Sequence, residues 1–245
     1  MSYQITMENK VAVVTGAAQG IGAAIASKYA EAGAQVVILD VCPKSCAEEL
    51  LQKLSKYGKK AAYYLCDVSD STAVAAVFAE VAHRYGRVDV LVNNAGVVAD
   101  WDKSYAINAK GTYYCSEAAK PYLEKAEGTI IILTSASVFS GGTGIPQYVT
   151  TKAGSYALTL FLAREYAKAG IRVNGIAPAV IMSKMLVERF GSEEAAREHY
   201  KTVMPLGRMG EPEDIANIAL FLACELSEYL CGEVLIADGG RMHIG

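Results

Sequence analysis

The stretch Val11–Gly22, with the sequence VAVVTGAAQGIG, joins a short apolar run to a glycine-rich turn. The apolar residues before Thr15 indicate a buried strand, and the pattern of Ile21–Ala32 indicates a helix. The glycines of the turn let the backbone bend sharply and bring its N–H groups close to an anion at the start of that helix. The stretch therefore predicts a strand, a diphosphate-binding turn and a helix, although its spacing, GxxxGxG, differs from the commoner GxGxxG.

The rest of the chain repeats this alternation of apolar runs and amphipathic stretches. Few polar residues interrupt the runs, as in parallel strands that are covered on both faces. The order predicts the α/β class: a single Rossmann-type domain over residues 1–245, with a doubly wound parallel sheet of about seven strands and helices on both faces. The expected strands are Lys10–Thr15, Gln35–Asp40, Ala61–Cys66, Val88–Asn93, Thr129–Leu133, Ile171–Ile176 and Glu233–Ile236. The expected helices are Ile21–Ala32, Cys46–Tyr57, Thr72–Tyr85, Ser104–Glu124, Gln147–Ala169 and Pro212–Cys224.

Composition argues against several classes of function. With a net charge of −3, the chain has no basic surface suited to nucleic acid or to an anionic membrane. No apolar run is long enough to span a bilayer, and residues 1–10 lack the apolar core of a signal peptide. The six cysteines include no CxxC pair and the three histidines lie far apart, so we expect no metal site, reduced thiols and a cytoplasmic location.

Asp40 ends the second expected strand, eighteen residues after Gly22. A carboxylate at this place accepts hydrogen bonds from the adenosine ribose hydroxyls of a dinucleotide and repels a 2′-phosphate. Neither Ala17–Gln19 nor Val41–Cys42 offers an arginine or a lysine for such a phosphate. We therefore predict NAD as the cofactor. The plainer interpretation is that Asp40 only caps a helix or a turn.

Tyr148 and Lys152 are four residues apart, which on a helix puts the phenol and the ammonium on one face. Ser135 lies thirteen positions before Tyr148, at the end of an apolar run, so its hydroxyl can fold back towards them. Ser137 is a nearby competitor, and fifteen tyrosines make a chance Tyr-xxx-Lys pair plausible. Because the three residues follow a dinucleotide turn, we interpret them as a proton-transfer group beside a nucleotide.

Together these features resemble the classical short-chain dehydrogenase/reductase family over nearly the whole chain. The matching landmarks are Thr15-Gly16-xxx-Gly20-Ile21-Gly22, Asp67-Val68, Asn93-Asn94-Ala95-Gly96, Asn108, Ser135, Tyr148-xxx-Lys152, Asn174 with Pro178, Gly207-Arg208-x-Gly210-x-Pro212-x-Asp214 and Asp238-Gly239-Gly240. The resemblance implies that the catalytic residues are Asn108, Ser135, Tyr148 and Lys152. It implies that the cofactor is bound by Gly16, Gln19, Gly20, Ile21, Gly22, Asp40, Asp67, Val68, Asn94, Ala95, Gly96, Tyr148, Lys152, Pro178, Ala179, Ile181 and Ser183.

The expected reaction interconverts a secondary alcohol and its ketone by hydride transfer, with Tyr148 as general acid and base. Its pKa of about 10 would have to fall to about 7, a preference of roughly 4 kcal/mol for the phenolate. One ammonium about 5 Å away supplies roughly 3 kcal/mol at an effective dielectric constant near 20. We therefore expect Lys152 to supply most of the shift and the positive nicotinamide ring to supply the rest.

Two further residues complete the expected mechanism. Ser135 would donate a hydrogen bond to the reacting oxygen, where negative charge develops. By resemblance, Asn108 holds a water that links Lys152 to solvent. The alternatives are that Ser135 is a strand-end cap and that Asn108 only bends its helix by bonding the backbone.

Three positions depart from the family pattern. Ala179 replaces a glycine, Ser183 replaces a threonine, and only four residues separate Gly96 from Trp101, where the family has more. The shortened segment would lie at the mouth of the active site. Either the pocket is more open, or part of this segment is absent from the recorded chain.

The irregular stretch 179–206 predicts a lid over the substrate, because long connections with their own helical patch are often functional. A mixed apolar and polar pocket suits a polyol, a diol, a hydroxy acid or a hydroxysteroid. The expected substrate contacts are Ser137, Val138, Phe139, Gln147, Met182, Met185 and Phe190. By resemblance, the helices 104–124 and 147–169 pair subunits in a homotetramer, with a dimer as the alternative.

Three other functions stay open. A non-catalytic dinucleotide sensor shares the fold but can lose its catalytic residues, which are all present here. A 3-oxoacyl-thioester reductase uses NADPH and an acidic carrier protein, whereas Asp40 and the acidic balance of the chain argue against both. A sugar-nucleotide epimerase resembles longer chains, with a C-terminal substrate domain that does not fit after Pro178.

Overall fold

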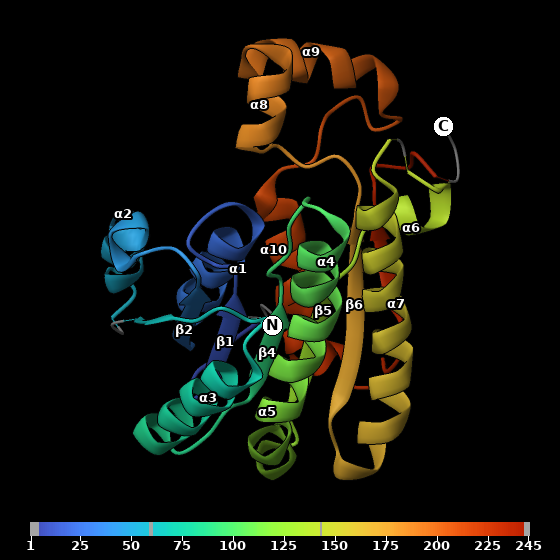
Figure 1. Ribbon diagram of the computed structural model, residues 1–245. Coiled ribbons are helices and arrows are strands. Elements are labelled where there is room, and N and C mark those ends of the chain that lie inside the picture. The colour runs from blue at the N-terminus through green and yellow to red at the C-terminus, as the bar shows by residue number, and fades with distance from the viewer. Residues whose placement is uncertain (1–4, 59–60, 143, 243–245) are drawn as a thin grey trace.

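Seven strands form one parallel sheet in the computed structural model, which describes residues 5–58, 61–142 and 144–242 (Figure 1). The strand order is β3-β2-β1-β4-β5-β6-β7, and all six neighbouring pairs are parallel. The predicted doubly wound sheet is therefore confirmed. The strands are β1 (Val11–Thr15), β2 (Gln35–Asp40), β3 (Ala62–Leu65), β4 (Val90–Asn93), β5 (Thr129–Leu133), β6 (Arg172–Pro178) and β7 (Val234–Ala237).

Helices cover both faces of this sheet. Ala12 and Val14 of β1 pack into a core with α1, α2 and α10, while Val11 and Val13 pack into a second core with α3, α5 and α7. This division follows from the period of two along a strand. The main helices are α1 (Gly20–Glu31), α2 (Glu48–Ser55), α3 (Ser71–Tyr85), α5 (Thr112–Ala126), α7 (Pro146–Tyr166) and α10 (Pro212–Ala223), and the short segments are η1 (Lys44–Ala47), α6 (Ser137–Ser140), η3 (Ala167–Ala169) and η4 (Glu225–Ser227). Among the described residues, no helix combines the length and the apolar composition needed to cross a bilayer.

The expected helix Ser104–Glu124 is divided in the structure. Helix α4 (Trp101–Ser104) continues into a π-helical segment, η2 (Tyr105–Gly111), and then into α5. Within η2, the main-chain oxygen of Asn108 accepts hydrogen bonds from Thr112 Oγ1 and from Ser155 Oγ, both at 2.8 Å. The two hydroxyl groups thus satisfy the carbonyl oxygen of Asn108 at the widened turn. Such π-helical turns are frequent at functional sites.

The carboxyl ends of four strands meet at one edge of the sheet. The strand order reverses between β1 and β4, which is where ligands bind in doubly wound folds. Next to them, the chain after β5 continues to pair with the end of β6, because Thr134 N donates to Ile176 O at 2.8 Å and Ala136 N donates to Pro178 O at 2.9 Å. The glycine turn, the end of β4 and the residues after β5 and β6 are thereby gathered at this edge.

Residues 179–206 contribute a separate layer beyond this edge, seen at the top of Figure 1. It consists of α8 (Lys184–Phe190) and α9 (Glu193–Val203). Tyr200 and Met204 form a small core there with Ala196 and Met209. Its function as a substrate lid stays a prediction.

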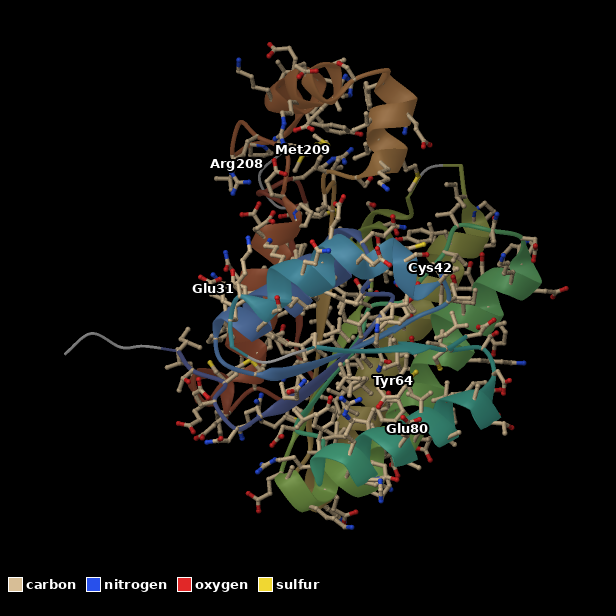
Figure 2. All side chains as sticks on the ribbon, turned by 90° about the vertical axis from the view of Figure 1, so that its left-hand side faces the viewer. Glu31, Cys42, Tyr64, Glu80, Arg208 and Met209 are labelled. Carbon is tan, nitrogen blue, oxygen red and sulfur yellow. The ribbon has the colours of Figure 1, made fainter. Side chains whose placement is uncertain are left out.

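Several contacts hold this layer and the segment that follows it against the body of the protein. Ile181 pairs with Gly210 in a parallel bridge. Arg208 donates to both carboxylate oxygens of Asp214 at the start of α10, at 2.6 and 2.8 Å. Figure 2 shows Arg208 and its neighbour Met209 between the two upper helices and the sheet body. The ion pair holds the pKa of Asp214 below its ordinary value.

Candidate active site

Ser135, Tyr148 and Lys152 line one cavity of about 530 Å³. Ser135 follows β5, and the other two residues stand in the first turns of α7. This helix begins at Pro146, whose fixed φ suits the first helical position. The cavity is also lined by Ile21, Asn94, Gly96, Pro178, Ala179, Ile181, Ser183 and Met185. Three of the four expected catalytic residues therefore line a cavity with seven further residues that were expected to bind a dinucleotide, whereas Asn108 does not line it.

Lys152 is buried, with 5% of its surface exposed. Its Nζ donates to Leu133 O at 2.7 Å, and Thr134 Oγ1 donates to Lys152 O at 2.8 Å, so α7 is tied to the end of β5. Burial penalises the ammonium and lowers the pKa of Lys152 to about 8. A Cβ at Gly96 would lie 3.1 Å from Nζ and 3.4 Å from Asn108 Oδ1. The lysine therefore fits closely against a residue that has no side chain.

The Tyr148 phenol has a raised pKa because it is buried, and a hydrogen bond with Ser135 partly opposes this shift. This corrects the expectation that Lys152 brings the pKa of the tyrosine down towards 7. Desolvation is the largest influence on both groups, and the ammonium is committed to the carbonyl of Leu133. Tyr148 is consequently a phenol at neutral pH, which is the form that donates a proton.

Asn108 is fully buried in η2. Its Oδ1 accepts from Val97 N at 2.8 Å, while its Nδ2 donates to Val97 O at 2.9 Å and to Thr151 Oγ1 at 3.0 Å. The side chain therefore fixes the segment after Gly96 against α7. Its participation in a water relay stays a prediction.

The glycine turn after β1 is held by the end of β4. Asn94 Nδ2 donates to Thr15 O and Gly16 O, both at 2.9 Å. Thr15 Oγ1 accepts from Asn94 N and Ala95 N, both at 3.0 Å. A Cβ at Gly22 would lie 2.5 Å from Asn94 Nδ2 and from Gly16 O, so only glycine fits there. Asn94 and Ala95 thus shape the turn that the sequence assigned to the cofactor.

The start of α1 is suited to an anion. Gln19 is its N-cap residue and makes no side-chain capping bond, and both Gln19 and Gly20 are exposed. The first backbone N–H groups of a helix have no partner within it and lie at the positive end of its dipole. Helix α1 begins directly after this turn, and its second residue, Ile21, lines the first cavity. The residues present therefore fit a dinucleotide diphosphate.

Asp40 is half-buried at the end of β2. Its Oδ2 accepts from Ala18 N at 2.9 Å, and its Oδ1 accepts from Cys42 N at 3.2 Å. The carboxylate therefore links β2 to the glycine turn, as the plainer interpretation of this residue anticipated. Because a carboxylate offers about four lone-pair positions, both oxygens can still accept from ribose hydroxyls.

Asp67 and Val68 follow β3 and have different surroundings. Asp67 is exposed, and its Oδ1 accepts from the N and the Oγ of Ser69 at 2.9 and 2.7 Å. Val68 is buried and packs beneath η2, where a Cβ at Gly111 would lie 2.7 Å from its Cγ2. Their expected contact with an adenine stays a prediction.

A second cavity of about 510 Å³ adjoins the first and shares Ser135, Tyr148 and Ala179 with it. Ser137 lines this second cavity, and its Oγ donates to Ser135 Oγ at 2.9 Å. The two serines that competed as catalytic candidates are therefore neighbours, and Ser135 alone of the two lines both cavities. The second cavity thus lies beside Tyr148, on the side that also includes Ser137.

Arg189 of α8 and Arg241 after β7 also line the second cavity. Neither residue was among the predicted substrate contacts. No local pattern singles them out, because each reaches the cavity only through the tertiary arrangement of α8 and of the chain after β7.

Five of the seven predicted substrate contacts line neither cavity. Phe139 makes an edge-on contact with Tyr156 of α7, with ring centres 5.5 Å apart. Phe190 and Met182 pack instead into the small core of the α8–α9 layer, which removes them from the substrate space. The other two residues that line neither cavity are Val138 and Gln147. Of the two predicted contacts that do line a cavity, Ser137 lines the second and Met185 lines the first.

Gln147 closes the shortened segment between Gly96 and Trp101. Its Nε2 donates to Ala99 O at 2.9 Å, and Ser104 Oγ donates to the same oxygen at 3.1 Å. The polar side chain that was expected to meet a substrate is therefore bonded to the main chain of this segment. The short segment is bonded at both ends and forms part of the wall of the first cavity.

Comparison with known proteins agrees with this geometry. A family model described as Enoyl-(Acyl carrier protein) reductase matches residues 16–242. The 3-oxoacyl-(acyl-carrier-protein) reductase FabG of Aquifex aeolicus is 35% identical over 97% of this chain and 99% of its own length. A short-chain type dehydrogenase/reductase from Mycobacterium marinum superimposes with a TM-score of 0.90 at 30% identity, covering 98% of each chain. A structure from Agrobacterium tumefaciens with bound NADP gives a TM-score of 0.87 at 33% identity, covering 98% of this chain and 99% of the other.

Proposed function

Because the chain belongs to the classical short-chain dehydrogenase/reductase family, we propose that it is an NAD(H)-dependent oxidoreductase that interconverts a secondary alcohol and its ketone. The substrate would be a polyol, a diol, a hydroxy acid or a hydroxysteroid. The observation that carries the proposal is that Ser135, Tyr148 and Lys152 line one cavity with Ile21 at the start of α1 and with Asn94, whose side chain holds the glycine turn. The non-catalytic sensor is disfavoured because these side chains converge.

In this proposal, the chain's own residues handle the proton. A nicotinamide dinucleotide bound along the glycine turn would supply or accept the hydride. In reduction, the Tyr148 phenol donates its proton to the oxygen of the carbonyl substrate, and Ser135 donates a hydrogen bond to the same oxygen. In oxidation the phenolate takes the proton of the alcohol. The raised pKa of Tyr148 favours the protonated phenol, which is the form that donates the proton in reduction.

Asp40 supports NAD over NADP. Its carboxylate would accept hydrogen bonds from the adenosine ribose hydroxyls, and a 2′-phosphate in the same place would meet like charge. The hydrogen bonds from Ala18 N and Cys42 N hold the carboxylate in place. The comparison of kcat/KM for NADH and NADPH tests this choice, and a preference for NADPH would reverse it.

The second candidate is an NADPH-dependent 3-oxoacyl-thioester reductase. It is favoured by one specific finding, which is the 35% identity to the Aquifex aeolicus reductase over nearly the whole chain. It shares the catalytic residues and differs in cofactor and substrate. Turnover of an acyl thioester with NADPH, in preference to simple ketones with NADH, would select this candidate.

The proposed function is tested by following NADH absorbance against a panel of ketones, oxo acids and thioesters, together with the variant Tyr148→Phe. We expect turnover of at least one carbonyl class, and a loss of at least a hundredfold in kcat for Tyr148→Phe, with NADH binding unchanged. Tyr148→Phe with substantial residual kcat would contradict the assignment of the acid.

We also propose that the chain forms a homo-oligomer and is located in the cytoplasm. Tyr113 of α5 and Phe161 of α7 expose 38% and 54% of their surfaces, as apolar residues at a subunit contact would in a single chain. A homotetramer, or a dimer, would cover them, and sedimentation measures this directly. All six cysteines are unpaired, which suits a reducing compartment such as the cytoplasm.

A further inference from the structure

The second cavity carries a concentration of positive charge that the proposed reaction does not require. Among the described residues, its two ionisable side chains besides Tyr148 are the guanidinium groups of Arg189 and Arg241, and no acidic one lines it. Its remaining polar side chains are serine hydroxyls. Its volume of about 510 Å³ falls within the ~300–1,000 Å³ typical of small-molecule sites.

Within the described residues, neither of these two arginines has a carboxylate partner, unlike the two arginines that lie near them at the α8–α9 layer. Arg208 is paired with Asp214, and Arg197 is paired with Glu193 and with Glu211. By contrast, Arg189 and Arg241 form no ion pair with any residue in the described part of the chain. A guanidinium left unpaired beside a catalytic group is available for a ligand.

Arg241 stands on a fixed turn. Asp238 is buried, and its carboxylate accepts from Gly240 N at 2.9 Å and from Met242 N at 2.7 Å. Arg241 N donates to Asp238 O at 3.3 Å. Arg189 approaches from a different part of the fold, the last turn of α8, where its guanidinium lies 5.8 Å from the centre of the Phe190 ring. Two distant segments thus bring cations to one cavity.

We propose that the carbonyl substrate carries an anionic group, a carboxylate or a phosphate, which Arg189 and Arg241 bind while its carbonyl meets Ser135 and Tyr148. This inference rests on the proposed function and narrows its substrate class. Guanidinium groups match the geometry of both anions through paired N–H donors. A hydroxy acid or a phosphorylated hydroxyketone therefore fits the cavity better than a neutral steroid or polyol.

The test compares charged substrates with neutral partners of similar shape. With NADH, kcat/KM is measured for 3-oxobutanoate against its methyl ester, and for hydroxyacetone phosphate against hydroxyacetone. We expect the charged member of at least one pair to be favoured about tenfold to a hundredfold, the range for hydrogen bonds to a charged group. The pair that shows the preference distinguishes carboxylate from phosphate. Equal values within both pairs would overturn the inference and leave the oxidoreductase assignment standing.

Substitutions of the two arginines test whether they cause the preference for charged substrates. Arg189→Gln and Arg241→Gln should each raise KM for the charged substrate about tenfold or more, with kcat and the neutral substrate little changed. Arg164→Gln, an exposed arginine of α7 outside the cavity, is the matched control and should change neither. Equal losses on charged and neutral substrates would contradict a binding role.

Binding can also be measured without turnover. In the Tyr148→Phe variant loaded with NADH, calorimetry should detect the favoured anion and should lose that signal when Arg189→Gln and Arg241→Gln are added. If wild-type protein reduces no carbonyl compound of either charge, the proposed function fails. This binding measurement still decides the inference, because undiminished binding in the triple variant would refute it.

Discussion

Replacing Lys152 with methionine should stabilise the protein while abolishing its activity. Burial lowers the pKa of this lysine from 10.5 to about 8, and each pKa unit corresponds to about 1.4 kcal/mol, so keeping it charged at pH 7 costs about 3 kcal/mol of folding free energy. Methionine fills similar space without that cost. It leaves Leu133 O without its 2.7 Å donor, which costs about 1–2 kcal/mol. We expect a net gain of about 1–2 kcal/mol.

The sign of the pH dependence makes this prediction specific. Between the folded pKa of about 8 and the unfolded value of 10.5, the unfolded chain binds more protons at Lys152, so the wild-type protein gains stability as pH rises. The advantage of Lys152→Met should therefore be full below pH 8 and should disappear by about pH 10.

Urea unfolding at matched protein concentration measures the difference, because assembly makes apparent stability depend on concentration. Lys168→Met, at an exposed lysine beyond the end of α7, is the control and should change stability by no more than about 0.5 kcal/mol. Two results would refute the reasoning: a Lys152→Met protein less stable than wild type at pH 7, or a difference that does not change between pH 7 and pH 10.

Three further outcomes follow from the structure. Gly22→Ala should weaken NADH binding at least tenfold by fluorescence titration, because its Cβ would displace the backbone of the turn at Gly16; unchanged affinity would argue against this cradle. Asp89→Ala should cost about 2 kcal/mol in urea unfolding, since it leaves the buried Val11 N without its acceptor while the half-exposed Arg87 can turn to solvent; a cost below about 1 kcal/mol would contradict this reasoning. Asp214, whose pKa is lowered, stabilises the folded state above its ordinary pKa and loses this effect as pH falls through the folded value, so Asp214→Asn should remove part of the acid sensitivity of thermal unfolding.

Local patterns in the sequence were sufficient to predict the sheet and the three side chains that share the first cavity. The spacing of Tyr148 and Lys152 on one helix and the position of Ser135 after a strand led to a shared cavity. The alternation of strands and helices likewise predicted the seven-stranded sheet. Each of these depends on short-range periodicity and on the rule that parallel strands end at one edge.

The features of the site that the sequence did not predict depend on contacts between residues far apart in the chain. Gln147 is bonded to Ala99, forty-eight residues away, and Arg241 reaches the cavity from beyond the last strand. Met182 and Phe190 turn into a small core that forms only when α8 packs on α9. No spacing rule reveals such pairings in a single sequence.

The electrostatics of the site were mispredicted for a related reason. A Coulomb estimate between Tyr148 and Lys152 ignored the desolvation of both groups. It also could not foresee that Leu133 O would accept from the lysine. Burial is a property of the folded surroundings, and here it outweighs the attraction expected from proximity alone.

Deuterium transfer tests most directly whether Tyr148 drives hydride transfer between a nicotinamide and a carbonyl carbon. Wild-type protein and Tyr148→Phe are each supplied with NADH carrying deuterium at C4 and with the preferred carbonyl substrate, and the label in the alcohol is measured by mass spectrometry. We predict one deuterium per alcohol formed by the wild-type protein and a rate at least a hundredfold lower in the variant. An unlabelled alcohol, or equal rates in the two proteins, would contradict the mechanism.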